Sequence, residues 1–122
     1  MILADTSVWV DHFRFGDPRL SDELNRGMIL MHSFVAGELS LGSLMQRESV
    51  LAEIDSLPMA QVARVDEVRF LIERQSLFSR GIGYIDAHLL ASVLLTPHTQ
   101  LWTRDKRLRT VAESFGLHAL LD

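Results

Sequence analysis

Short apolar segments alternate with helical segments along the whole chain, and this alternation is the feature that most constrains the fold. Three apolar segments are predicted as buried strands, at 2–4, 28–31 and 100–103, with two weaker ones at 61–63 and 118–121. Helical patterns cover 8–13, 20–26, 33–45, 47–57, 66–79, 86–95 and 106–115. Short buried strands between helices predict a parallel sheet covered on both faces. We therefore expect an α/β fold.

The composition restricts both the cell compartment and the chemistry. A chain of 122 residues is expected to form one domain with its own core. Because cysteine is absent, disulfides, thiolate zinc sites and a cysteine nucleophile are excluded. There is no signal-peptide pattern and no apolar stretch of the roughly 18 to 20 residues that a membrane helix needs. We expect a cytoplasmic protein that makes no membrane contact.

Charge and hydropathy give weaker indications about partners. The net charge of −4 argues against a protein that coats nucleic acid through bulk charge, although a nuclease with an acidic site and local basic segments remains compatible with it. The mean hydropathy of +0.14 is explained equally well by a well-filled core or by an apolar surface that meets a second protein.

Four of the sixteen acidic residues are embedded in apolar sequence, namely Asp5, Glu38, Asp86 and Asp105. Asp5 and Asp105 each follow a predicted strand and precede a helix. In open α/β sheets, ligands bind beyond the carboxyl ends of the strands, which is where these two residues are expected. Taken singly, each is also a good helix N-cap, so capping is the alternative interpretation.

Glu38 and Asp86 lie on predicted helices. The neighbours of Glu38 three and four positions away include Phe34, Val35 and Leu41, which predicts an apolar surrounding. A carboxylate there is costly unless a cation, hydrogen-bond donors or an arginine from elsewhere meets it. Helix capping explains Asp86 only in part, because its neighbours on the same helix face are also apolar.

Considered together, the four acids favour a site for a divalent cation. Mg²⁺ and Mn²⁺ prefer oxygen ligands, and Mg²⁺ typically takes one or two carboxylates together with water and phosphate oxygens. Such an ion activates water and neutralises a phosphate during in-line displacement, so no histidine base is required.

Several segments carry a resemblance to a known family. They are residues 5–11, Glu38 on a helix of small residues, residues 83–91 and residues 101–108. In this order they resemble the PIN-domain ribonucleases, and more narrowly the VapC toxins of type II toxin–antitoxin systems. The resemblance implies a Rossmann-like α/β/α sandwich with a short, mainly parallel central sheet, formed by residues 1–122 as a single PIN domain. It also implies Mg²⁺- or Mn²⁺-dependent endonucleolytic cleavage of RNA, a homodimer, and a cognate VapB antitoxin whose C-terminal segment lies over the active site.

The resemblance also assigns roles to residues. It implies that the catalytic and metal-binding residues are Asp5, Glu38, Asp86 and Asp105. It places supporting hydroxyl groups at Thr6, Ser7 and Thr103, for which helix capping is the alternative.

Other polar and aromatic residues near these motifs have simpler interpretations. Four cations beside Asp105 are candidates for RNA phosphate contacts, with a solvated helix start as the alternative: Arg104, Lys106, Arg107 and Arg109. Trp9 and Trp102 are expected in the core. The histidines at positions 12, 32 and 88 are expected to find local hydrogen-bond partners.

Other functions are compatible with some of these features. A phosphoacceptor receiver domain has a similar size and architecture, but it needs adjacent acids after the first strand and a lysine after the last strand. Here one acid follows the first strand, and Lys106 lies on a helix. A PIN nuclease that is not a toxin, or a PIN module of RNA processing, is the nearer alternative.

Overall fold

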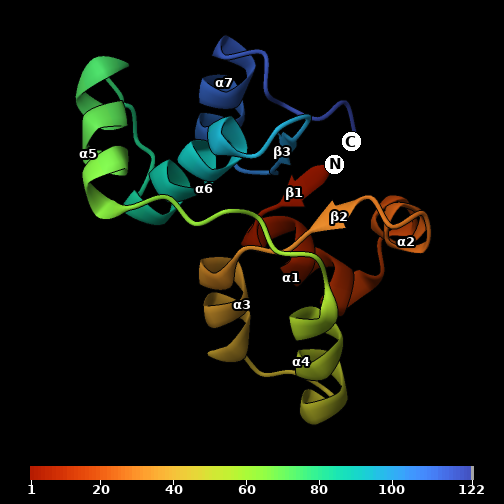
Figure 1. The fold of residues 1–122 in the computed structure, drawn as a ribbon. Coiled ribbons are helices and arrows are strands. Elements are labelled where there is room, and N and C mark those ends of the chain that lie inside the picture. The colour runs from red at the N-terminus through yellow and green to blue at the C-terminus, as the bar shows by residue number, and fades with distance from the viewer. Residues whose placement is uncertain (122) are drawn as a thin grey trace.

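The computed structural model describes residues 1–121 and has a small parallel sheet at its centre (Figure 1). The strands are β1 (Ile2–Ala4), β2 (Ile29–Leu30) and β3 (Gln100–Trp102). Their order is β2-β1-β3, and both pairs are parallel. The central strand is apolar and buried, with Leu3 and Ala4 fully shielded from solvent. The three predicted strands are therefore present, and all three point toward the same edge of the sheet.

The helices lie on both sides of this sheet. Within the described residues they are α1 (Thr6–Phe15), α2 (Pro18–Asn25), α3 (Ser33–Ser40), α4 (Arg47–Ser56), α5 (Val65–Arg74), α6 (Tyr84–Leu95) and α7 (Lys106–Ser114). The step from β1 to β2 and the step from β2 back past β1 to β3 run in opposite directions, so right-handed connections place their helices on opposite faces. In Figure 1, α1, α3 and α4 lie below the strands, whereas α5 and α6 lie to their left and α7 lies above them. This arrangement confirms the predicted α/β/α fold.

The two weaker predicted strands are reduced to single bridges at the sheet edges. Met59 bridges Met31, so the pairing lies before the predicted segment 61–63, in which Val62 is exposed. His118 bridges Leu101, but the chain then leaves the sheet, and Leu120 is 92% exposed. Neither predicted segment forms a strand: the bridge at one edge involves Met59 and not residues 61–63, and in the segment 118–121 only His118 forms a bridge.

Two helices end earlier than their apolar patterns indicate. The α3 helix was expected to reach residue 45 but ends at Ser40, where Arg47 donates to the carbonyl of Ser40 at 2.5 Å and to that of Gly42 at 3.2 Å. These bonds satisfy carbonyl groups that a longer helix would use internally. The α5 helix was expected to reach residue 79 but ends at Arg74, and Ser76 then adopts a left-handed conformation with φ 52°.

The core joins β1 and β3 to α6 and α7, and it includes both tryptophans. Trp102 is fully buried and Trp9 is 3% exposed, as predicted. The α6 helix is buried almost all round, from Ala87 to Val93. Its first turn therefore has a fixed position relative to the carboxyl ends of the strands, and this turn carries Asp86. No helix within residues 1–121 combines the length and the hydropathy needed to cross a membrane.

Candidate functional site

The site lies where β1 and β3 end side by side. Ala4 pairs with Trp102 in the parallel register, and the amide of Asp5 donates to the Trp102 carbonyl at 3.0 Å. The chain leaves both strands at this level, so Asp5 lies beside the segment formed by Thr103, Arg104 and Asp105. The sheet topology thus brings together residues about a hundred positions apart, as the rule for open α/β sheets predicts.

Asp5 is a buried carboxylate with a full set of donors. Its Oδ1 accepts from Ser7 Oγ at 2.5 Å and from the amide of Val8 at 3.3 Å, and its Oδ2 accepts from Thr103 Oγ1. Burial raises the pKa of Asp5, although the hydrogen bonds from Ser7 and Thr103 act in the opposite direction. Asp5 is therefore the N-cap of α1, as the alternative interpretation held, and it is also fixed toward β3.

Asp86 is the acid whose pKa is influenced by all three of the others. It lies in the first turn of α6, half-buried, and its Oδ2 accepts from the Gly83 amide at 3.0 Å. Burial is the main cause that raises the pKa of Asp86, and the negative charges of Asp5, Asp105 and Glu38 raise it further. Each of the other three predicted acids therefore lies close enough to Asp86 to act on its carboxylate.

Asp105 faces solvent at the start of α7. Its Oδ1 caps the helix by accepting from the amides of Arg107 and Leu108, both at 3.0 Å. Its own amide donates to Thr103 Oγ1 at 3.0 Å. The Thr103 hydroxyl therefore connects the backbone of Asp105 to the carboxylate of Asp5. Capping occupies one oxygen of Asp105, and Oδ2 accepts no hydrogen bond from residues 1–121.

The surroundings of Glu38 differ from those that the sequence predicts. It is exposed in the last turn of α3, so its predicted apolar surrounding is wrong. The adjacent Leu41 is itself 89% exposed, because the helix ends there and the apolar neighbours no longer form a covered face. Glu38 has no ion pair within residues 1–121. Its partner is a hydroxyl group, since Thr6 Oγ1 donates to its Oε1 at 2.7 Å.

The donor set fits a hard divalent cation. All four acids offer carboxylate oxygens, which Mg²⁺ and Mn²⁺ prefer. Among residues 1–121, no group of three or more acidic or histidine side chains is already arranged to hold a metal ion. The repulsion recorded at Asp86 is the electrostatic condition that such a cation relieves.

The four predicted RNA-contact cations differ in their surroundings. Arg104 forms ion pairs with Asp11 at 2.8 Å and with Asp17. Arg109 pairs with Glu113 at 2.9 Å. Lys106 and Arg107 are exposed and form no ion pair within residues 1–121. The Arg107 side chain crosses Gly81, in the loop that leads to Asp86: a Cβ added there would lie 2.5 Å from Arg107 Cδ.

The sequence interpretation missed the acidic partners of Arg104. Asp11 and Asp17 were not singled out, and nothing near them in sequence indicates a partner about ninety residues away. The prediction for the histidines holds in part. His12 and His32 accept local amide bonds, but the buried Nδ1 of His88 has no partner in the described part of the chain.

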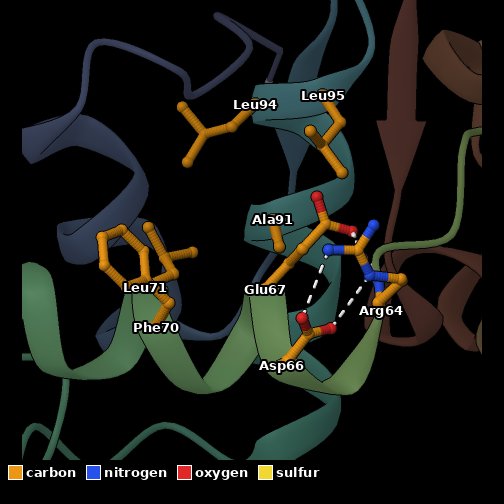
Figure 2. Close-up of a pocket in the computed structure, with 8 residues that line it drawn as sticks. All are labelled: Arg64, Asp66, Glu67, Phe70, Leu71, Ala91, Leu94 and Leu95. Carbon is orange, nitrogen blue, oxygen red and sulfur yellow. Dashed lines mark hydrogen bonds and ion pairs between the residues drawn. The ribbon is translucent and has the colours of Figure 1, made fainter.

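A groove of about 460 Å³ lies between α5 and α6, away from the carboxylates (Figure 2). Its floor is apolar, and Phe70, Leu71 and Leu94 contribute to it. At its rim, Arg64 forms a two-point ion pair with Asp66, at 3.0 Å and 3.2 Å. None of the four predicted acids lines this groove, so it is separate from the candidate site.

Comparison with known proteins decides the family. The model of the PIN domain matches residues 2–114. The chain belongs to the PIN-domain family. It is also 44% identical over 117 residues to ribonuclease VapC32 of Mycobacterium tuberculosis, both in strain CDC 1551 / Oshkosh and in strain H37Rv. The match covers 96% of this chain and 94% of the relative. These matches confirm the predicted family and exclude the receiver-domain alternative for this PIN protein.

Proposed function

We propose that this PIN-domain protein is a VapC-type endoribonuclease that requires Mg²⁺ or Mn²⁺, with residues 1–122 as one domain. The similarity to ribonuclease VapC32 supports the activity and the toxin class. The observation that carries the metal site is made at Asp86: burial raises the pKa of this carboxyl group, and the charges of Asp5, Asp105 and Glu38 raise it further. Four acids gathered beyond the strand ends are suited to hold a cation against an RNA phosphate.

Different residues of the chain have different roles in the proposed phosphodiester hydrolysis. Asp5, Glu38, Asp86 and Asp105 would hold a divalent ion, which would supply a water molecule of lowered pKa and would neutralise charge on the scissile phosphate. Ser7 and Thr103 fix the two oxygens of Asp5, and Thr6 orients Glu38. The water adds hydroxide to phosphorus, the bond to the leaving oxygen breaks, and that oxygen ends with a proton.

Arg107 is the best placed of the four RNA-contact candidates. Its side chain lies against Gly81, in the loop that leads to Asp86, and it begins in the first turn of α7, directly after Asp105 and Lys106. Because it has no ion pair within residues 1–121, its charge is available for a phosphate oxygen. Lys106 is exposed on the same helix turn and extends this basic edge. Arg104 and Arg109 share their charges with acids of the chain itself.

The partners of this PIN protein follow from its similarity to VapC proteins. A cognate VapB-type antitoxin binds over the carboxylates and blocks access of RNA. A second copy of the chain forms a homodimer, to which exposed apolar side chains such as Phe70 and Leu94 offer surface. Light scattering of the purified chain measures its oligomeric state. Titration with the product of an adjacent small reading frame measures inhibition of RNA cleavage.

The decisive experiment replaces each carboxylate by its amide. Asp5→Asn, Glu38→Gln, Asp86→Asn and Asp105→Asn should each reduce cleavage of a structured RNA pool in Mn²⁺ by at least the roughly 10- to 100-fold that loss of an outer partner of a metal ligand costs. Asparagine still caps a helix, so the fold should survive. The matched control is Asp55→Asn, which replaces an exposed acid outside the site. Near-wild-type cleavage by any two of the four variants would contradict the site.

The toxin class is tested separately from the nuclease. Expression of the wild-type chain without an antitoxin should arrest growth, and Asp5→Asn should relieve the arrest. If soluble wild type cleaves RNA and yet is harmless, the protein is a PIN nuclease of another class.

A further inference from the structure

The side chain of Arg104 joins two helices that precede it by about ninety residues. Its Nη1 lies 2.8 Å from Asp11 Oδ2 on α1, and its Nη2 pairs with Asp17 Oδ2. Asp17 is 7% exposed and uses its other oxygen to cap α2, accepting from the amides of Arg19 and Leu20. A planar guanidinium can hold two carboxylates at once, whereas a lysine ammonium reaches them only as a point charge.

The main chain of Arg104 makes a third contact with the same face of α1. Its amide donates to Ser7 Oγ at 3.0 Å, and Ser7 Oγ in turn donates to Asp5 Oδ1 at 2.5 Å. Ser7 and Asp11 are four residues apart, so they lie on successive turns of one helix face. Arg104 therefore fixes the segment after β3 against α1 at two levels.

This placement controls both oxygens of Asp5. Ser7 holds Oδ1 and receives its own hydrogen bond from the Arg104 amide. The adjacent Thr103 holds Oδ2 and receives its hydrogen bond from the Asp105 amide. A displacement of the segment 103–105 from α1 would move both donors and would also turn the Asp105 carboxylate. Meanwhile, the charge of Arg104 is offset by two carboxylates, which reduces its attraction for a phosphate.

We propose that Arg104, clasped by Asp11 and Asp17, is a positioning residue that holds Asp5 and Asp105 in the conformation that binds the divalent ion, and that it does not contact RNA. The inference rests on the proposed function, because it assumes that these acids bind the ion. Loss of an outer hydrogen-bonding partner of a metal site typically costs 10- to 100-fold in metal affinity or activity. Arg104 acts at this level, through Ser7 and Thr103.

The experiment measures metal binding without RNA. Mn²⁺ dissociation constants are determined by calorimetry for wild type, Arg104→Gln, Arg104→Lys and Asp11→Asn. Arg26→Gln is the control, since it removes a different arginine ion pair, with Glu23 at 2.9 Å on α2. We expect Arg104→Gln to weaken Mn²⁺ binding by about tenfold. Arg104→Lys and Asp11→Asn, which each keep part of the clasp, should lie between it and wild type, and Arg26→Gln should match wild type.

A kinetic arm separates positioning from RNA contact. For Arg104→Gln, kcat at fixed Mn²⁺ should fall, while the slope of log KM against log salt stays at its wild-type value. A lost phosphate contact would instead raise KM and reduce that slope by about 0.7, with Mn²⁺ affinity unchanged, and this result would overturn the proposal. Combining Arg104→Gln with Ser7→Ala should cost less Mn²⁺ affinity than the sum of the two changes, because both loosen the attachment of the segment 103–105 to α1.

Stability measurements distinguish a loss of folding from a loss of Mn²⁺ binding. Urea unfolding identifies the conditions in which each variant is folded, and all affinities are compared there. If Arg104→Gln does not fold, Arg104→Lys and Asp11→Asn carry the test. Folded variants with wild-type Mn²⁺ affinity would overturn the proposal and leave Arg104 a purely structural residue. Failure of the wild-type protein to bind Mn²⁺ would instead contradict the proposed function, and the inference would fall with it.

Discussion

Thr103 donates its hydroxyl hydrogen to Oδ2 of Asp5, although the two residues are 98 positions apart in the chain. The same hydroxyl oxygen accepts from the amide of Asp105 at 3.0 Å. Thr103 is 1% exposed, so neither bond can be replaced by bulk water. One buried side chain thus connects the acid after β1 to the acid after β3, and the distance between these two carboxylates depends on it.

Thr103→Val should therefore affect both stability and activity. The change keeps the shape of the side chain but leaves the Asp5 carboxylate and the Asp105 amide without this partner, which costs about 1–3 kcal/mol for a buried group. Thr103→Ser keeps the hydroxyl and should be close to wild type in cleavage. Urea unfolding and Mn²⁺-dependent cleavage measure the two effects. Equal behaviour of the valine and serine variants would show that the hydroxyl has no role.

Asp86→Asn should stabilise the metal-free protein. Burial and the charges of three other acids raise the pKa of Asp86, so the fold destabilises the ionised form of this carboxyl group. The amide removes this charge, and its oxygen can still accept from Gly83. The melting temperature in EDTA should therefore rise relative to wild type.

Added metal should stabilise wild type more than it stabilises Asp86→Asn. A cation at about ten times its dissociation constant stabilises the folded state by about 1.4 kcal/mol. For a domain of this size that is a rise of roughly 3 to 6 °C in melting temperature. The shift should shrink in Asp86→Asn. Thermal scans with EDTA, with Mg²⁺ and with a salt of matched ionic strength decide the matter, and equal shifts in both proteins would contradict a metal at this position.

The strands and the positions of three acids could be predicted from local sequence. Each of the three strands is a short apolar segment, and the general rule for parallel sheets then places Asp5 and Asp105 at one edge. Asp86 was predictable because α6 is apolar all round. Each of these inferences needs only the residues within one or two turns of the position concerned.

The remainder depended on contacts between distant segments. Helical periodicity identified the apolar neighbours of Glu38, but not that α3 ends at Ser40 and leaves Glu38 in solvent. The charge of Arg104 was read as available for RNA, because its two acidic partners lie 93 and 87 positions away. Whether an exposed-looking cation is already paired is decided by tertiary structure.

The buried His32 should make the protein less stable in mild acid. Its Nδ1 accepts from the amide of Phe34 at 2.9 Å, so its Nε2 carries the hydrogen and faces Ser92 Oγ at 2.9 Å. Burial, with a smaller effect of His88, lowers the pKa of His32 to about 4. The unfolded chain binds a proton near pH 6.5, whereas the folded chain does not.

Stability due to His32 is therefore present above pH 6.5 and is lost as the pH falls toward 4, by about 3 kcal/mol in total. His32→Asn keeps an N-cap for α3 but cannot titrate, so its stability should depend less on pH in this range. The control is His98→Asn, at an exposed histidine. Urea unfolding at pH 4.5, 5.5 and 7 measures the difference. Parallel curves for wild type and His32→Asn would refute the assignment.

A side chain at position 81 should disturb Arg107, which lies against Gly81. Its backbone has φ +79°, and an added Cβ would lie 2.5 Å from Cδ and 2.7 Å from Nη1 of Arg107. Asparagine tolerates this left-handed conformation better than other residues. Gly81→Asn should therefore keep the turn but displace the Arg107 side chain from the loop that leads to Asp86.

If Arg107 binds an RNA phosphate, its removal and its displacement should have the same effect. Arg107→Ala should raise KM for RNA and reduce the slope of log KM against log salt by about 0.7, and Gly81→Asn should do likewise. The double variant should be no worse than Arg107→Ala alone, because the two changes remove one contact. Gly27→Asn is the matched control, since Gly27 has φ +68° with nothing within 4 Å of an added Cβ. Additive losses in the double variant would mean that Gly81 acts on the Asp86 loop itself and that Arg107 does not depend on it.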